Sequence, residues 1–93
     1  MAAHEFLFEI ELSGPVPSRD LLSDLACQAF AQAGCSNADL PAIVDSLQSA
    51  IAGCASAGEV VCGLRFRAHA GELEIDVTSS GGGRIWHASR RTA

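Results

Sequence analysis

Residues 40–83 read LPAIVDSLQSAIAGCASAGEVVCGLRFRAHAGELEIDVTSSGGG, and this stretch decides the fold that we expect. Its first part repeats apolar residues at three- and four-residue steps, which predicts a helix with one apolar face. Pro41 is tolerated only in a first turn, so this helix should begin near residue 40 and end near Gly53 or Cys54. Two alternating runs follow, which predict strands with one apolar face each. The apolar positions are Leu40, Ile43, Val44, Leu47, Ile51 and Cys54 on the helix, and Cys62, Leu64, Phe66, Ala68, Leu73, Ile75 and Val77 on the strands.

The two strands predict a hairpin that turns at Ala70 and Gly71. Arginines on the first strand should face acidic residues on the second, because directly opposed side chains of opposite charge help to set the register. We therefore interpret these charges as structural and expect the face that carries them to be wet. That face would hold Glu9, Glu11, Arg65, Arg67, Glu72, Glu74 and Asp76.

The segment before residue 40 predicts one more strand and one more helix. Residues 5–12 alternate in the period of a half-buried strand, and residues 13–17 contain two prolines and a glycine that interrupt it. Ser18 can cap a helix that Gly34 ends. The core positions expected here are Phe6, Phe8, Ile10 and Leu12 on the strand, and Leu21, Leu22, Leu25, Ala26, Ala29, Phe30 and Ala33 on the helix.

The resulting order is strand, helix, helix, strand, strand. Because each element has a single apolar face, we expect an α+β fold with two helices packed on one face of a three-stranded sheet. The 93 residues allow one domain, with residues 84–93 as a polar, basic tail in which 84–87 could restart a short element.

The amino-acid composition argues against several classes of function, among them nucleic-acid binding and membrane insertion. The net charge is −5 and the chain contains no lysine, which argues against nucleic-acid binding because that needs clustered basic residues. No apolar run is long enough to span a membrane, and the first residues do not resemble a signal peptide, so we expect a cytosolic protein with no membrane partner. The four cysteines lack metal-ligand spacing, and we expect them to be reduced, with Cys27, Cys54 and Cys62 on core faces.

One family resemblance follows from the helix and the hairpin. Asp45-Ser46-Leu47-Gln48-Ser49-Ala50-Ile51-Ala52-Gly53 resembles the Glu-x-x-x-Asn-Ala-Ile/Val-x-His helix of the anti-sigma serine kinases, which share the Bergerat (GHKL) ATPase fold with histidine kinases. Leu73 to Gly83 resembles the strand of that family that ends in Asp-x-Gly-x-Gly. The span from residue 5 to residue 83 is thus similar to the N-terminal part of such a domain.

The resemblance implies a degenerate nucleotide site. The family's water-polarising Glu, magnesium-binding Asn and adenine-binding Asp correspond to Asp45, Ser49 and Ser79, and only Gly81 and Gly83 match the glycine motif outright. A serine is a poorer magnesium ligand than an amide, and it cannot supply the carboxylate's hydrogen bond to adenine. We therefore expect no cofactor, no metal and no catalytic residue.

The function that we expect is that of a small regulatory or protein-interaction domain. Its partner would be another protein, of the kind found in sigma-factor or two-component pathways, or a second copy in a homodimer. Ile85 and Trp86 are the expected contact residues, although the tryptophan could instead close the monomer's own core. The alternatives are a regulatory kinase-like protein that still binds ATP, and a structural subunit.

Overall fold

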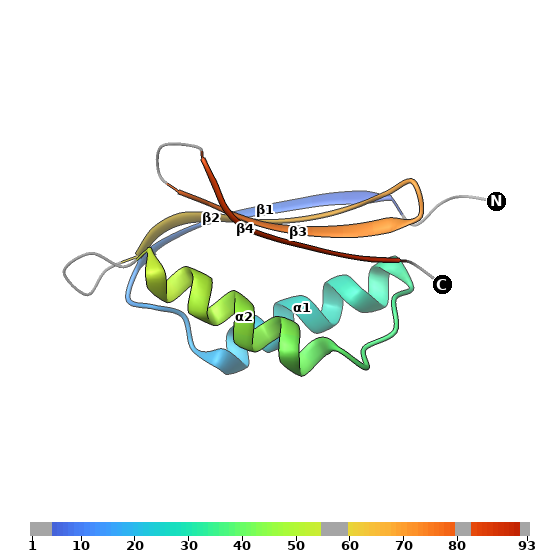
Figure 1. Ribbon diagram of the computed structural model, residues 1–93, viewed down its shortest axis with the longest axis horizontal. Helices are drawn as coiled ribbons and strands as arrows, with labels where there is room; N and C mark the ends of the chain where they lie inside the picture. Colours follow the sequence, from blue (N-terminus) through green and yellow to red (C-terminus); the bar gives the residue numbers. More distant parts are fainter. Residues whose placement is uncertain (1–4, 55–59, 80–82, 92–93) are drawn as a thin grey trace.

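The computed structural model describes residues 5–54, 60–79 and 83–91. It forms two layers, with a twisted sheet on one side and two helices on the other (Figure 1). The elements in chain order are β1 (Phe6–Gly14), α1 (Arg19–Ala33), α2 (Leu40–Gly53), β2 (Val60–His69), β3 (Glu72–Ser79) and β4 (Arg84–Arg91).

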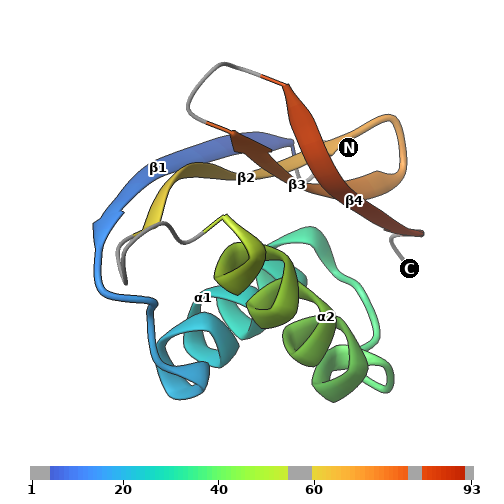
Figure 2. The ribbon, with the colours of Figure 1, turned by 60° about the vertical axis from the view of Figure 1, so that its left-hand side comes forward.

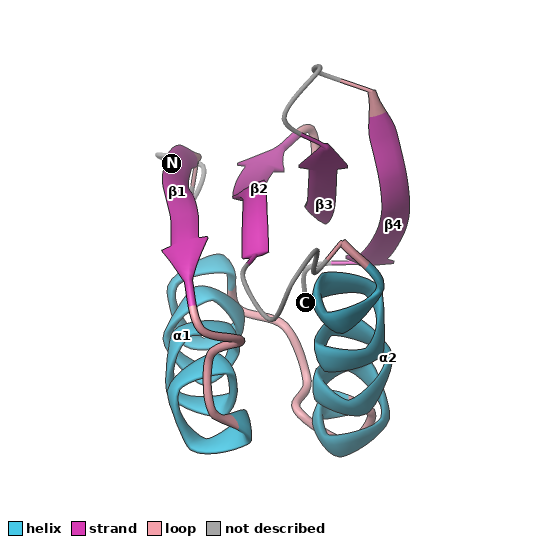
Figure 3. Cartoon of the chain, turned by 90° about the vertical axis from the view of Figure 1, so that its left-hand side faces the viewer, coloured by secondary structure: helices cyan, strands magenta, loops and turns pink. Residues whose placement is uncertain are grey.

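The sheet has four strands in the order β1-β2-β3-β4, and every neighbouring pair is antiparallel. Figure 2 shows both helices on the same face of this sheet. Viewed end-on, α1 lies on the β1 side and α2 on the β4 side (Figure 3). The other face of the sheet carries no helix among the described residues. β1 and β4 are consequently the two edge strands.

The expected three-stranded sheet is wrong, because residues 84–91 form a fourth strand and not a tail. Trp86 and Ala88 pack against the core from this strand, while Arg84 and His87 pair with Asp76 on the opposite face. The arginines made this segment resemble a solvated tail, but each has a specific position on a strand. The β3–β4 ladder contains one irregularity, between Val77 and Thr78.

The helix ends follow the local sequence signals. The Ser18 hydroxyl accepts a hydrogen bond from the Leu21 amide at 3.2 Å, and Gly34 ends α1 with a φ of 76°. Pro41 lies in the first turn of α2. One face of each helix is buried in the core, with Leu22, Ala26, Ala29, Phe30 and Ala33 on α1, and Leu40, Ile43, Val44, Leu47 and Ile51 on α2. Within the described residues, neither helix is long and apolar enough to cross a membrane.

The hairpin register confirms the expected charge pairing. Arg65 lies directly opposite Asp76, and Arg67 lies opposite Glu74. The turn residues Ala70 and Gly71 both have positive φ, at 51° and 77°. Two consecutive left-handed residues are the geometry of a tight turn whose twist matches the strands that it joins.

The core is as expected on α2, β2 and β3, with three corrections elsewhere. Leu21 is 48% exposed, Phe8 is 43% exposed, and Cys27 is exposed as well. α1 lies on the β1 side of the sheet (Figure 3), and Phe6, Ile10 and Leu12 of β1 are partly buried against the core, which leaves Phe8 as the exposed residue on the inner face of this strand. All four cysteines are free, and burial raises the pKa of the Cys62 thiol to about 11, which keeps it unreactive.

The packing of α2 predicts that Leu47→Ala strongly lowers the stability of the fold. Leu47 is fully buried, so the truncation should lower the free energy of unfolding by about 2–5 kcal/mol, out of about 5–15 kcal/mol for a domain of ordinary stability. Urea titration followed by circular dichroism measures this. Leu21→Ala is the matched control, and it should cost less than about 0.5 kcal/mol. Equal losses in the two variants would contradict the packing.

Candidate functional site

The most unusual side chain of the structure is Asp76, on the helix-free face of the sheet. Its position in β3 places it on the face that we expected to be wet, yet it is only 1% exposed. Charged residues are almost never fully buried unless they are paired. The expectation of a wet Asp76 is therefore wrong, and the cover comes from neighbouring polar side chains.

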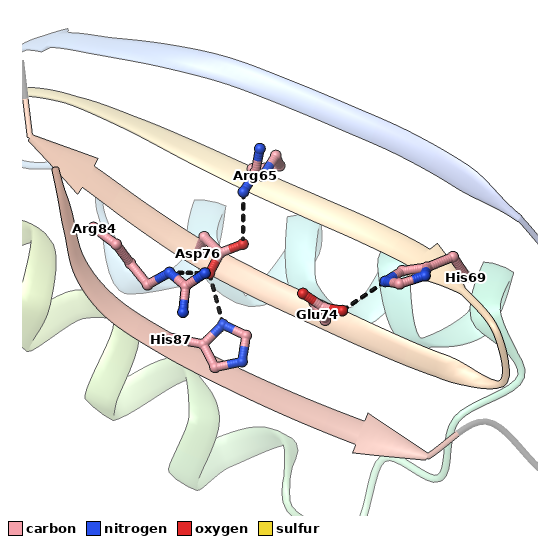
Figure 4. Close-up of polar contacts among 6 residues, drawn as sticks. All are labelled: Arg65, His69, Glu74, Asp76, Arg84 and His87. Carbon is pink, nitrogen blue, oxygen red and sulfur yellow. Dashed lines mark hydrogen bonds and ion pairs between the residues drawn. The ribbon is translucent and has the colours of Figure 1, made fainter. Parts of the chain in front are cut away.

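Three basic groups from two strands surround the Asp76 carboxylate (Figure 4). Nη2 of Arg65, on β2, donates to Oδ2 at 3.2 Å. On β4, Nδ1 of His87 lies 2.6 Å from Oδ1, and Nε of Arg84 lies 3.2 Å from the same oxygen. Both carboxylate oxygens are thereby engaged, and one side chain links the three strands β2, β3 and β4.

A second histidine–carboxylate pair lies on the same face, nearer the hairpin turn. Nε2 of His69 lies 2.6 Å from Oε2 of Glu74, and both side chains are partly exposed (Figure 4). This hydrogen bond lowers the pKa of Glu74. For Asp76, burial acts to raise the pKa, but the hydrogen bonds from His87 and Arg65 and the nearby charges outweigh it and hold the pKa below its ordinary value.

The chemistry of this cluster favours a structural network over a metal centre. Glu74, Asp76 and His87 each offer one ligand atom, and these atoms lie within 4.8 Å of one another. However, both oxygens of Asp76 already bind positively charged or hydrogen-bonding groups, and two guanidinium groups beside the site would repel a divalent cation. Among the described residues, no hydroxyl or thiol is hydrogen-bonded to either histidine, so no nucleophile is positioned there.

The structure brings together part of the nucleotide site that the resemblance implied. Ser49 and Ser79 line one hollow at the end of α2, whereas Asp45 lines a neighbouring one. The Asp45 carboxylate accepts a hydrogen bond from Nε of Arg19 at 2.8 Å. The Gly83 carbonyl accepts one from the Ser79 amide at 2.8 Å. Gly81 lies outside the described residues.

The expected contact residues Ile85 and Trp86 lie at the start of β4, beside α2. Ile85 is 47% exposed, and Trp86 is partly buried against the core. Together they border a shallow groove of about 510 Å³ with residues of α2, namely Asp45, Ser46, Ser49 and Ala50. The tryptophan thus contacts the core and also borders an open groove at the β4 edge.

A second groove, at the opposite edge, was missed by the sequence reasoning. It lies between β1 and α1 and has a volume of about 380 Å³. Its lining is mostly apolar and consists of Phe6, Leu7, Phe8, Leu25, Gln28, Ala29 and Gln32. The alternation of β1 placed Phe8 on the core face correctly. However, nothing in that pattern shows how far the cover of the helices extends.

The lowered pKa values of Asp76 and Glu74 predict that acid destabilises the fold. A carboxyl whose folded pKa is depressed adds stability that is fully present above its ordinary pKa of about 4 and is lost as the pH falls through the lower, folded value. The free energy of unfolding should therefore decrease below about pH 5. Urea titrations between neutral pH and pH 3 measure this decrease.

We expect a replacement of the buried Asp76 carboxylate to lower the free energy of unfolding at neutral pH as well. Asp76→Asn removes the charge that both arginines contact, so it should cost about 1.5–3 kcal/mol at pH 7 and reduce the acid dependence. Asp20→Asn, at an exposed carboxyl on α1, is the control and should preserve the acid dependence. An acid dependence that is the same in Asp76→Asn and in the parent would contradict the role given to Asp76.

Because serines stand where the family has its nucleotide-binding side chains, we expect no measurable binding of ATP or ADP up to about millimolar concentration. Ser49 and Ser79 lack the two strong polar contacts of the family, each worth about 1.5–3 kcal/mol, and Arg19 engages Asp45. Isothermal titration with Mg-ATP tests this, with magnesium alone as the control. Micromolar affinity would contradict the prediction and favour the ATP-binding alternative.

No protein-family model matches this chain, and neither does any of the curated proteins or solved structures with which it was compared. The resemblance to the anti-sigma kinases therefore stays a prediction that rests on the residues quoted for it. The function has to be inferred from the geometry of the chain itself.

Proposed function

We propose that this chain is a small protein-interaction domain that binds an extended segment of another polypeptide along the free edge of β1. The observation that carries the proposal is the exposed Phe8 on the inner face of this edge strand, beside the groove between β1 and α1. Phe8 is 43% exposed above a groove whose far wall is α1. An edge strand beside an apolar groove can bind a peptide as an added strand, with the backbone giving affinity and the groove giving specificity.

The free edge of β1 supports backbone pairing. β1 is nine residues long and pairs with β2 without interruption from Phe6 to Gly14. It contains no proline and no bulge, which are two of the features by which proteins protect exposed edges. Among the described residues, no strand pairs with its other side, so a row of amide and carbonyl groups is open to a partner.

The apolar surface at this edge supports side-chain recognition. Leu25 and Ala29 of α1 form the wall that faces Phe8. Leu7, which is 58% exposed, adds apolar surface on the opposite face of the same edge strand. The Phe8 ring is stacked on the buried ring of Phe66, with centroids 6.2 Å apart, so the groove has a firm wall. A partner side chain that enters the groove would bury apolar surface that the monomer leaves in water.

The charges of β1 define the chemistry of the partner. Glu9 and Glu11 are exposed on its outer face, and neither forms an ion pair among the described residues. A binding segment should therefore alternate apolar residues, facing the groove, with basic residues, facing the glutamates. The expected partner is an extended, amphipathic and basic segment.

A random peptide library displayed on phage tests this proposal. Peptides selected on the immobilised domain should show alternating apolar and basic residues. In amide NMR spectra of the domain, titration with a selected peptide should shift resonances of β1 and α1. Failure to select any peptide that shifts these resonances would overturn the proposal, as would shifts confined to the Asp76 face.

A pair of variants at the two edges locates the binding surface. Phe8→Asp places a charge at the groove and should weaken binding of a selected peptide at least about tenfold, which corresponds to about 1.4 kcal/mol. Ile85→Asp makes the same kind of change at a comparably exposed residue on the other edge and should leave the affinity unchanged. Circular dichroism checks that both variants are folded. A larger loss in Ile85→Asp would instead assign peptide binding to the β4 groove.

A further inference from the structure

We propose that the segment bound by β1 is strand β4 of another copy of this chain, so that copies associate edge to edge and head to tail. This inference rests on the proposed function, because it names the partner of the same edge. It is carried by three complementary features of the two sheet edges: their charge, their strand direction and their apolar side chains.

The charges on the helix-free face alternate in sign from strand to strand. One row across the sheet contains an acid on β1, an arginine on β2, an acid on β3 and a histidine on β4: Glu9, Arg65, Asp76 and His87. This alternation leaves the two edges with different character. The β1 edge presents Glu9 and Glu11, and the β4 edge presents Arg84, His87 and Arg91.

These charges discriminate between the possible edge contacts. Two β1 edges would bring glutamates together, and two β4 edges would bring arginines together, and like charges directly opposite each other are unfavourable. A β1 edge against a β4 edge instead continues the alternation already present within the sheet. Charge therefore selects the contact between unlike edges.

Strand direction is also compatible with this contact. Each strand runs antiparallel to its neighbour, so β1 and β4 of one copy run in opposite directions. A second copy placed beside the first in the same orientation offers its β4 antiparallel to β1. The two sheets then join into one antiparallel sheet, with all helices on the same face.

The register of the monomer shows which side chains would meet. Along the sheet's own rows, Glu9 aligns with His87 and Glu11 aligns with Arg84. A neighbour added without slippage thus places Arg84 and His87 between two acids, Asp76 of their own chain and a glutamate of the other. Each basic group of β4 gains a second acidic neighbour.

The inner faces complement each other in the same register. Phe8 lies on the row of Ala88, and Ile10 lies on the row of Trp86. A large side chain therefore meets a small one, and the partly buried indole meets an aliphatic side chain. The two grooves lie at different levels of this joint, because the β1 groove contains Phe8, on the row of Ala88, and the β4 groove contains Trp86, on the row of Ile10.

The predicted contact joins two different surfaces, so each bound copy still has one free edge. Such heterologous contacts produce closed rings or open chains, whereas a two-fold dimer uses one surface twice. The association should therefore continue past the dimer as concentration rises. In this association Ile85 and Trp86 of one copy would contact β1 of the neighbouring copy.

Sedimentation velocity and tryptophan fluorescence measure the association of the intact chain. The weight-average sedimentation coefficient should rise with concentration past the dimer value. Trp86 is the chain's one tryptophan, so its emission should shift to shorter wavelength over the same range as the neighbour covers it. A monomer at every concentration would overturn this inference. Peptides that bind β1 could still be selected in that case, so a failure of the self-association is distinguishable from a failure of the proposed peptide binding.

Complementary charge reversal tests the pairing itself. Glu11 lies opposite Gly63 and forms no ion pair in the part of the chain that the structure describes, so Glu11→Arg reverses its charge without breaking one. Arg84→Glu reverses the charge of its expected partner. Each variant alone should associate at least tenfold more weakly than the parent, and an equimolar mixture should recover the association. Asp24→Arg, an exposed change on α1 outside both grooves, is the control and should behave like the parent.

The outcomes of this experiment are distinct. A dimer that persists in both variants, or a mixture that gains nothing over its components, would overturn the head-to-tail contact. Arg84 also pairs with Asp76, so Arg84→Glu could unfold the chain, and circular dichroism detects this. Arg84→Gln then replaces it. That variant should weaken the association, and an unchanged sedimentation profile would contradict the proposal.

Discussion

The packing of two helices against one face of the four-stranded sheet is the constraint on which the rest of the structure depends, because it buries the central strands fully and the edge strands only in part. The helices approach β2, β3 and β4, and there they bury Phe66, Leu73 and Val77 completely. β1 is paired with β2 through its backbone, and its inner face is covered in part: Phe6, Ile10 and Leu12 pack against the core, whereas Phe8 is 43% exposed. Phe8 therefore keeps part of its apolar area in water, although the strand is fully paired with β2.

The helix-free face is stabilised in a different way, because no helix or strand of the described ranges packs on it. Cross-strand ion pairs take the place of a packed layer there, and the most central carboxylate is shielded by the groups that neutralise it. Asp76 gains hydrogen bonds from Arg65 and His87 in exchange for water. A buried charge is tolerated only when its partners satisfy it. The network therefore fixes the order and register of β2, β3 and β4, and we assign it that role.

Local signals in the sequence were sufficient to predict β1, α1, α2, β2 and β3, but they missed β4 and could not show which side chains the helices cover. Gly34, Pro41 and the Ala70-Gly71 pair act on their own backbone, so the ends of the helices and the hairpin turn could be predicted from residue type. Strand β4 could not, because its arginines resemble a solvated tail until Asp76 is placed beside them. The exposure of Phe8 depends on how α1 packs beneath β1, and alternation along a strand contains no information about that packing.

The same reasoning explains why the edges of this sheet differ from its interior. Inside the sheet, every basic side chain has an acidic residue on a neighbouring strand, and the register keeps them aligned. At the edges the alternation has no next strand, which leaves Glu9 and Glu11 on one side and Arg84 and Arg91 on the other. An ion pair formed at an edge is partly exposed and weak on its own. Specificity then comes from the combination of charge, strand direction and the apolar side chains beneath, because a partner that satisfies only one of them leaves the other groups unpaired.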